Sequence, residues 1–184
     1  MKREYKDQSL IAFEKSKEIG LEPNLNFKTV VNGIFSQNML GLCQHEIHPF
    51  LIQRFGSSSW ALQCLNVAPQ VFAILKHLRI DCELVFGEVK VSGKPQFSAS
   101  LQGLLNELDS PEKKEFAVHV WIQVGKDYII DPTIASQLHR HCSSHIDPTQ
   151  IFVGKAKKLG RDAKLEYQPM LMGEKFLDLT CERS

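Results

Sequence analysis

The chain has 184 residues, of which 43% are apolar and 23% charged, and its formal net charge is +1. This length predicts a single domain, residues 1–184, with a real hydrophobic core, and the near-neutral charge argues against nucleic acid as a partner. No run of about 18 apolar residues occurs and the charged start lacks the apolar segment of a secretory signal, so we expect neither a membrane span nor a membrane partner.

The first part of the chain is predicted to be mostly helical. Residues 1–20 have the pattern of a polar amphipathic helix with Leu10, Ile11 and Phe13 as its apolar stripe. Residues 27–42 have a mixed pattern that favours a helix, and residues 44–49 are expected to be a loop or a helix end.

A second helical region follows. The serines at 57–59 form a plausible N-cap for a helix that carries Trp60 and Cys64, and Pro69 is expected to kink or interrupt it. Beyond the proline, the apolar residues follow helical spacing and are expected to face the core. These are Val71, Phe72, Leu75 and Leu78.

The remainder is predicted to contain strands. Residues 82–89 have the composition of a strand, and residues 92–115 are irregular with a short helix near 101–108. Residues 116–124 and 128–130 then form a hairpin, and residues 135–146 are a His-rich connection. Helices followed by strands in hairpin order indicate an α+β protein.

The length of the hairpin turn decides which side chains share a face. A three-residue turn at 125–127 places Val124 opposite Tyr128, and counting outwards places Trp121 opposite Asp131. His119 is then diagonal to Asp131 on the same face, about 7–8 Å away at the backbone, which a carboxylate and an imidazole can span. A two-residue turn would move Asp131 to the other face.

Three separated stretches supply the parts of a cysteine nucleophile site. Cys64 offers a thiol close to an expected helix start, His119 an imidazole that can deprotonate it, and Asp131 a carboxylate that can orient the imidazole. The five cysteines are odd in number, irregularly spaced and free of Cys-x-x-Cys pairs. Reduced thiols in a cytoplasmic protein are therefore the simplest interpretation.

The order of these residues resembles the transglutaminase-like superfamily over residues 57–135. Cys64 and Ala68 match the family's cysteine helix, and Leu75 with Leu78 matches its apolar face. The other matching positions are Gly87, His119, Trp121, Asp131, Pro132 and Thr133.

The resemblance implies a papain-like fold in which a cysteine-bearing helix lies against an antiparallel sheet. It also implies the reaction class. Cys64 would be the nucleophile, His119 the general base and later acid, and Asp131 the orienting group, with no cofactor or bound metal. The main-chain N–H of Cys64 and a second, unidentified donor would hold the oxyanion. The substrate would be a peptide or protein amide, with hydrolysis, deamidation and amine transfer left open.

Several alternatives remain at this level. Leu62 and Pro69 depart from the family pattern, which favours a non-catalytic interaction domain with the same fold; an arylamine N-acetyltransferase-like enzyme ranks lower. Trp60 and Trp121 are either core residues, the preferred interpretation, or a groove wall or transition-state donor. A second Asp-Pro-Thr at 147–149 is expected to be a turn. Two segments offer soft and imidazole metal donors, although neither has a familiar zinc spacing. They contain Cys43, His45 and His48, and His139, His141, Cys142 and His145.

Overall fold

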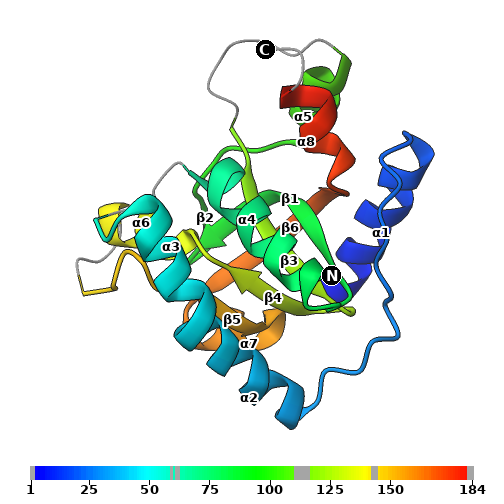
Figure 1. The fold of residues 1–184 in the computed structure, drawn as a ribbon. Helices are drawn as coiled ribbons and strands as arrows, with labels where there is room; N and C mark the ends of the chain where they lie inside the picture. Colours follow the sequence, from blue (N-terminus) through cyan, green and yellow to red (C-terminus); the bar gives the residue numbers. More distant parts are fainter. Residues whose placement is uncertain (1–2, 59, 61–62, 110–116, 142–144, 182–184) are drawn as a thin grey trace.

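The computed structural model describes residues 3–58, 60, 63–109, 117–141 and 145–181, in which helices cover both faces of an antiparallel sheet (Figure 1). Within this part of the chain the sheet has six strands in the order β2-β1-β3-β4-β5, and β6 also pairs with β1. The strands are β1 Cys82–Val91, β2 Lys94–Pro95, β3 His119–Val124, β4 Tyr128–Asp131, β5 Phe152–Lys155 and β6 Leu165–Met172. All pairings are antiparallel, which confirms the α+β class.

The helices surround this sheet, with α4 across one face and α1 beside β6 (Figure 1). They are α1 Tyr5–Glu18, α2 Gly33–Leu42, η1 Cys43–Ile47, α3 His48–Phe55, α4 Cys64–His77, α5 Leu101–Asp109, α6 Ile134–His141, α7 Ala156–Asp162 and α8 Lys175–Cys181. η1 is a π-helical segment that joins α2 to α3.

The core divides into two layers because side chains alternate across the strands. On one face, Phe86, Val120 and Ile122 pack with α4. On the other face, Trp121 and Ile129 pack with residues of α1, α6 and α7. Both faces are therefore buried, and this explains why the central strands are almost continuously apolar.

Helix α4 differs from the sequence prediction at its start. It begins at Cys64 after Gln63, so Trp60 precedes it and the serines do not cap it; Ser59 and Leu62 lie outside the described residues. The helix is continuous through Pro69, so the expected interruption there is wrong. Burial of the helix face against the sheet offsets the missing N–H of the proline.

The predicted apolar faces are partly confirmed. On α4, Val71, Phe72 and Leu75 are buried, whereas Leu78, at the helix end, is 48% exposed. On α1 the prediction is right only for Phe13, which packs against the core; Leu10 and Ile11 are about half exposed, and the buried residues are Ser9, Ala12 and Ser16. Small side chains let α1 approach β6, and the hydroxyl of Ser16 accepts a bond from the Met172 N–H at 2.7 Å.

Other elements also correct the expectation. Residues 44–49 are helical, and residues 27–42 are helical only from Gly33, where the Asn32 side chain accepts a bond from the Phe35 N–H at 2.8 Å. The His-rich segment after Ala135 forms most of α6 rather than a connection. Ile134 and Leu138, one helical turn apart, are buried against the sheet and stabilise this helix.

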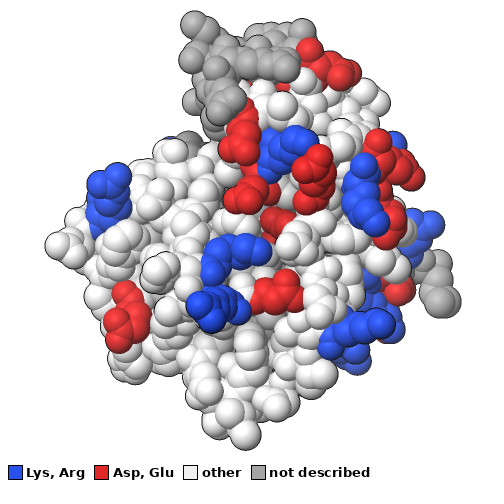
Figure 2. All heavy atoms as spheres, turned by 45° about the vertical axis from the view of Figure 1, so that its right-hand side comes forward, with Lys and Arg blue, Asp and Glu red and all other residues white. Residues whose placement is uncertain are grey.

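The surface carries charges of both signs. Figure 2 shows Lys and Arg side chains interleaved with Asp and Glu on the face that it displays. None of the described helices combines the length and the apolar character needed to cross a membrane.

Gly87 on β1 is a position where the fold depends on the absence of a side chain. It pairs with His119, and a Cβ there would collide with the Gln168 carbonyl and lie 3.0 Å from Cη2 of Trp121. We expect Gly87→Ala to lower the free energy of unfolding by about 3 kcal/mol in urea denaturation. Gly41→Ala is the control, since a Cβ there meets nothing within 4 Å and should raise helix stability slightly. If the two variants change the free energy of unfolding equally, the close approach of β6 to Gly87 does not require a glycine.

Candidate active site

The hairpin of β3 and β4 has the predicted three-residue turn. Val124 pairs with Tyr128 and Ile122 with Ile130, which confirms the register. His119 is the first residue of β3 and Asp131 the last of β4, and their side chains meet through a bond of 2.7 Å between Nε2 and Oδ2. Both side chains are buried, so this contact is shielded from water.

Asp131 is held by four hydrogen bonds. Oδ2 accepts from Nε2 of His119 and, at 2.9 Å, from the hydroxyl of Tyr167 on β6. Oδ1 accepts from the N–H groups of Thr133 and Ile134, both at 3.0 Å. These amides lie at the start of α6, where the helix end favours a negative charge. The carboxylate therefore has a single well-defined orientation.

Tyr167 was not identified from the sequence. Burial, with the Asp131 carboxylate adding to it, raises the pKa of Tyr167 well above its ordinary value, so the hydroxyl stays protonated and donates to Asp131. The only signal in the sequence is its place among alternating buried residues of β6. That alternation indicates burial but not the partner.

The charge state of His119 is set by opposing effects. Burial alone would lower its pKa, but attraction and hydrogen bonding from Asp131 outweigh it, and the Cys64 thiol adds to the effect. The net result raises the pKa of His119 above its ordinary value. The imidazole is therefore held ready to carry a proton beside the thiol.

Cys64 lies beside the imidazole at the first position of α4. The residue is 6% exposed, and its thiol donates to the carbonyl of Val118, the neighbour of His119 in the chain, at 3.5 Å. Nδ1 of His119 is buried and has no hydrogen-bond partner among the described residues. Since Nε2 is occupied by Asp131, Nδ1 is the nitrogen left to exchange a proton with Cys64. The structure thus brings the three predicted residues together.

The start of α4 is tied to α6. The N–H of Trp60 donates to the Ser136 hydroxyl at 2.8 Å, and this hydroxyl donates to the Pro148 carbonyl. The main-chain N–H of Cys64 belongs to the first turn of α4, where amides point out of the helix end and favour an anion.

The two tryptophans are core residues. Both are fully buried, and their indole N–H groups are already used: Trp60 donates to the Gly56 carbonyl and Trp121 to the Tyr5 hydroxyl, each at 3.0 Å. Their interpretation as a groove wall or a transition-state donor is therefore wrong.

The other described cysteines have a different environment. Cys43 and Cys82 are free and buried, and burial raises the pKa of each thiol to about 12. Neither is a competing nucleophile at neutral pH. Cys142 and the side chain of Cys181 lie outside the described residues.

The described residues include no group of three or more His, Cys, Asp or Glu side chains placed to hold a metal ion. His139 instead contacts the Ile146 carbonyl at 2.8 Å, and His48 contacts the Thr149 hydroxyl at 3.0 Å. The Asp147 side chain accepts from the N–H of Thr149, which confirms the predicted turn at 147–149. Cys142, part of one proposed ligand set, is not described.

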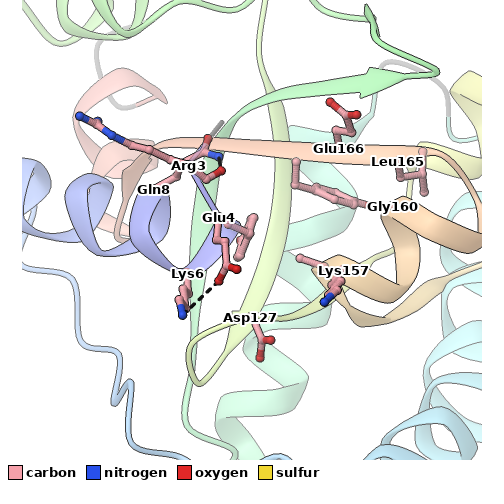
Figure 3. Close-up of a pocket in the computed structure, with 12 residues that line it drawn as sticks. Arg3, Glu4, Lys6, Gln8, Asp127, Lys157, Gly160, Leu165 and Glu166 are labelled. Carbon is pink, nitrogen blue, oxygen red and sulfur yellow. Dashed lines mark hydrogen bonds and ion pairs between the residues drawn. The ribbon is translucent and has the colours of Figure 1, made fainter. Parts of the chain in front are cut away.

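A cavity of about 400 Å³ lies between the start of α1, β6 and α7 (Figure 3). Tyr167 lines it together with charged residues of both signs, whereas Cys64, His119 and Asp131 do not. One ion pair in its wall joins Glu4 and Lys6 at 3.0 Å. Among the described residues, the cavity therefore contacts the candidate active site only through Tyr167, whose hydroxyl donates to Asp131.

Comparison with known proteins identifies no relative: no family model matches the chain, and it shows no significant similarity to curated proteins or to solved structures.

Proposed function

We propose that this protein is a cysteine-nucleophile acyl-transfer enzyme of the transglutaminase-like superfamily, with a papain-like arrangement of helix and sheet. The observation that carries the proposal is the buried 2.7 Å bond between His119 and Asp131, which leaves Nδ1 of the imidazole for Cys64. The position of the thiol at a helix N-terminus is a second support, because that position favours a developing negative charge.

The proposed reaction follows from this geometry. The raised pKa of His119 favours the state in which Nδ1 holds the proton of Cys64, and the sulfur, as a thiolate, attacks the carbonyl carbon of an amide. The N–H of Cys64 donates to the oxyanion. His119 then gives the proton to the leaving amine, and a thioester on Cys64 remains. Water or a second amine, deprotonated by His119, attacks the thioester and releases the thiol.

The proposed substrate is a peptide or protein amide, with hydrolysis, deamidation and amine transfer as possible outcomes of the second step. The mechanism assigns no role to a cofactor. The free thiols of Cys43, Cys64 and Cys82 support a reducing compartment, so we place the protein in the cytoplasm.

A non-catalytic interaction domain is the second candidate. The contact between the Cys64 thiol and the Val118 carbonyl favours it, because this bond points the proton of the thiol at the backbone rather than at Nδ1. The two candidates differ in the reactivity expected of Cys64.

Alkylation by iodoacetamide, read at each cysteine by peptide mass spectrometry, separates them. We expect Cys64 to react about tenfold faster than a free model thiol at pH 7, and His119→Ala to remove this advantage. Cys43 is the internal control, since its buried thiol should react slowly in both proteins. The catalytic function would be excluded if Cys64 reacts at the rate of the model thiol and if His119→Ala leaves that rate unchanged.

A further inference from the structure

Glu88 on β1 is a buried carboxylate whose hydrogen bonds all go to main-chain N–H groups. It is 3% exposed. Oε1 accepts from Val89 and Gln96 at 2.9 Å and from Phe97 at 3.0 Å, and Oε2 accepts from Ala99 at 2.9 Å. A buried carboxylate is costly unless its oxygens are bonded, so these contacts tie β1 firmly to residues 96–99.

This segment, the 96–99 loop, lies against the imidazole of the candidate active site. The Phe97 ring lies 4.5 Å from the His119 ring, centroid to centroid, with 21° between the planes. The same region of β1 contacts His119 from the sheet, because Gly87, next to Glu88, pairs with His119. Glu88 therefore connects the strand beside the imidazole to the ring stacked on it.

The 96–99 loop contains a residue with an unfavourable backbone conformation. Ser98, between Phe97 and Ala99, has φ of 57°, in the left-handed region that residues other than glycine avoid. Such a conformation persists only where the surroundings impose it. The bonds from Glu88 to the N–H groups on both sides of Ser98 provide that constraint.

We propose that Glu88 is a positioning residue: its carboxylate holds the 96–99 loop so that Phe97 stacks on His119 and fixes the orientation of the imidazole ring. The effect of Glu88 on catalysis rests on the proposed function. Its effect on the stacking of Phe97 and His119 does not depend on that function. A ring over the imidazole excludes water on that side and strengthens the contact with Asp131. It also restricts rotation of the imidazole, which keeps Nδ1 near the thiol.

The test compares two carboxylates of the same strand. Glu88→Gln keeps the size of the side chain, but its amide nitrogen cannot accept the bonds that the carboxylate accepts. The matched control is Glu83→Gln. Glu83 is also buried on β1, at 4% exposure, and accepts from the N–H groups of Asn24 and Leu84. Each variant loses hydrogen bonds between main-chain N–H groups and a buried carboxylate. Only the carboxylate of Glu88 accepts bonds from the 96–99 loop.

The first readout is the NMR shift of the His119 ring protons, which a stacked ring displaces. We expect Glu88→Gln and Phe97→Leu to move these shifts towards those of an unstacked histidine, and Phe97→Tyr to preserve them. Glu83→Gln should lower the melting temperature without changing the shifts. Unchanged His119 shifts in Glu88→Gln, or an equal change in Glu83→Gln, would overturn the positioning role.

The second readout is the alkylation rate of Cys64. We expect this rate to fall about tenfold in Glu88→Gln and in Phe97→Leu, while Glu83→Gln keeps the wild-type rate. The two readouts separate the two claims. If His119→Ala leaves the alkylation rate of Cys64 at its wild-type value, the proposed function is overturned. The NMR shifts of the His119 ring protons test the positioning role independently of that rate.

Discussion

Replacing Cys64 by alanine is expected to abolish turnover, with a loss of about 10⁵-fold or more in kcat/KM. The loss follows because the other cysteines whose side chains the structure describes cannot replace Cys64: Cys43 and Cys82 are thiols that burial keeps protonated. The measurement is release of ammonia or amine from a library of peptide amides, with and without an added amine. Mass spectrometry of the products then distinguishes hydrolysis, deamidation and transfer.

The control for this experiment is Cys43→Ala. It removes a thiol of similar burial from η1, an element that does not carry His119 or Asp131, so any loss that it causes reports on folding rather than chemistry. Cys64→Ala should also fold normally, because it removes one sulfur and one weak bond to the Val118 carbonyl. A substrate that both Cys64→Ala and wild type convert at the same rate would show that Cys64 is not the nucleophile.

Asp131→Asn is expected to have the second largest effect, a fall in turnover of about 10⁴-fold. Asparagine preserves the shape of the side chain but removes the charge that stabilises the protonated imidazole. It also has only one acceptor oxygen, so its amide nitrogen must face either His119 and Tyr167 or the main-chain N–H groups of Thr133 and Ile134. This mismatch loosens the orientation of Nδ1. Breaking this buried pair should lower the free energy of unfolding by about 3 kcal/mol.

The same variant should invert part of the pH dependence of stability. In wild type the pKa of His119 is raised by Asp131, so the stabilisation is complete below about pH 6.5, the unfolded value, and is lost as pH rises through the folded pKa. Without the carboxylate, burial dominates and lowers the pKa of His119. The variant should then become more stable as pH rises towards about 6.5.

Urea denaturation at a series of pH values between about 5 and 8 measures this difference. Glu83, Cys43 and Cys82 also have raised pKa values, but they are unchanged in the variant and cancel when the two proteins are compared. Asp7→Asn, at an exposed site in α1, is the control for loss of a carboxylate. If the free energy of unfolding changes with pH in the same way in wild type and in Asp131→Asn, His119 and Asp131 do not form a charged pair.

The hairpin shows how far local reasoning reaches. The turn at 125–127 and the two-residue alternation of the strands are properties of about a dozen consecutive residues, and they are enough to place His119 and Asp131 on one face. The strand at Cys82 and the helix near Leu101 were also predictable, because each has a clear pattern and a clear boundary.

Elsewhere, packing between distant segments overrode the local signal. The serines before Trp60 suggest a helix cap, but the Trp60 N–H donates to the hydroxyl of Ser136 on α6, and α4 begins at Cys64 instead. The stripe of Leu10 and Ile11 faces solvent because small residues on the other side of α1 fit closely against β6.

The sequence by itself therefore indicated the α+β class and determined the hairpin register, which places His119 and Asp131 on one face, because short-range turn and strand geometry specifies that register. Cys64 was chosen from the order of the motifs and an expected helix start. Only the tertiary structure decided what surrounds those residues. Tyr167 lies 36 positions from Asp131, and the 96–99 loop reaches His119 across the sheet. Such contacts depend on how whole elements pack, which no local pattern encodes.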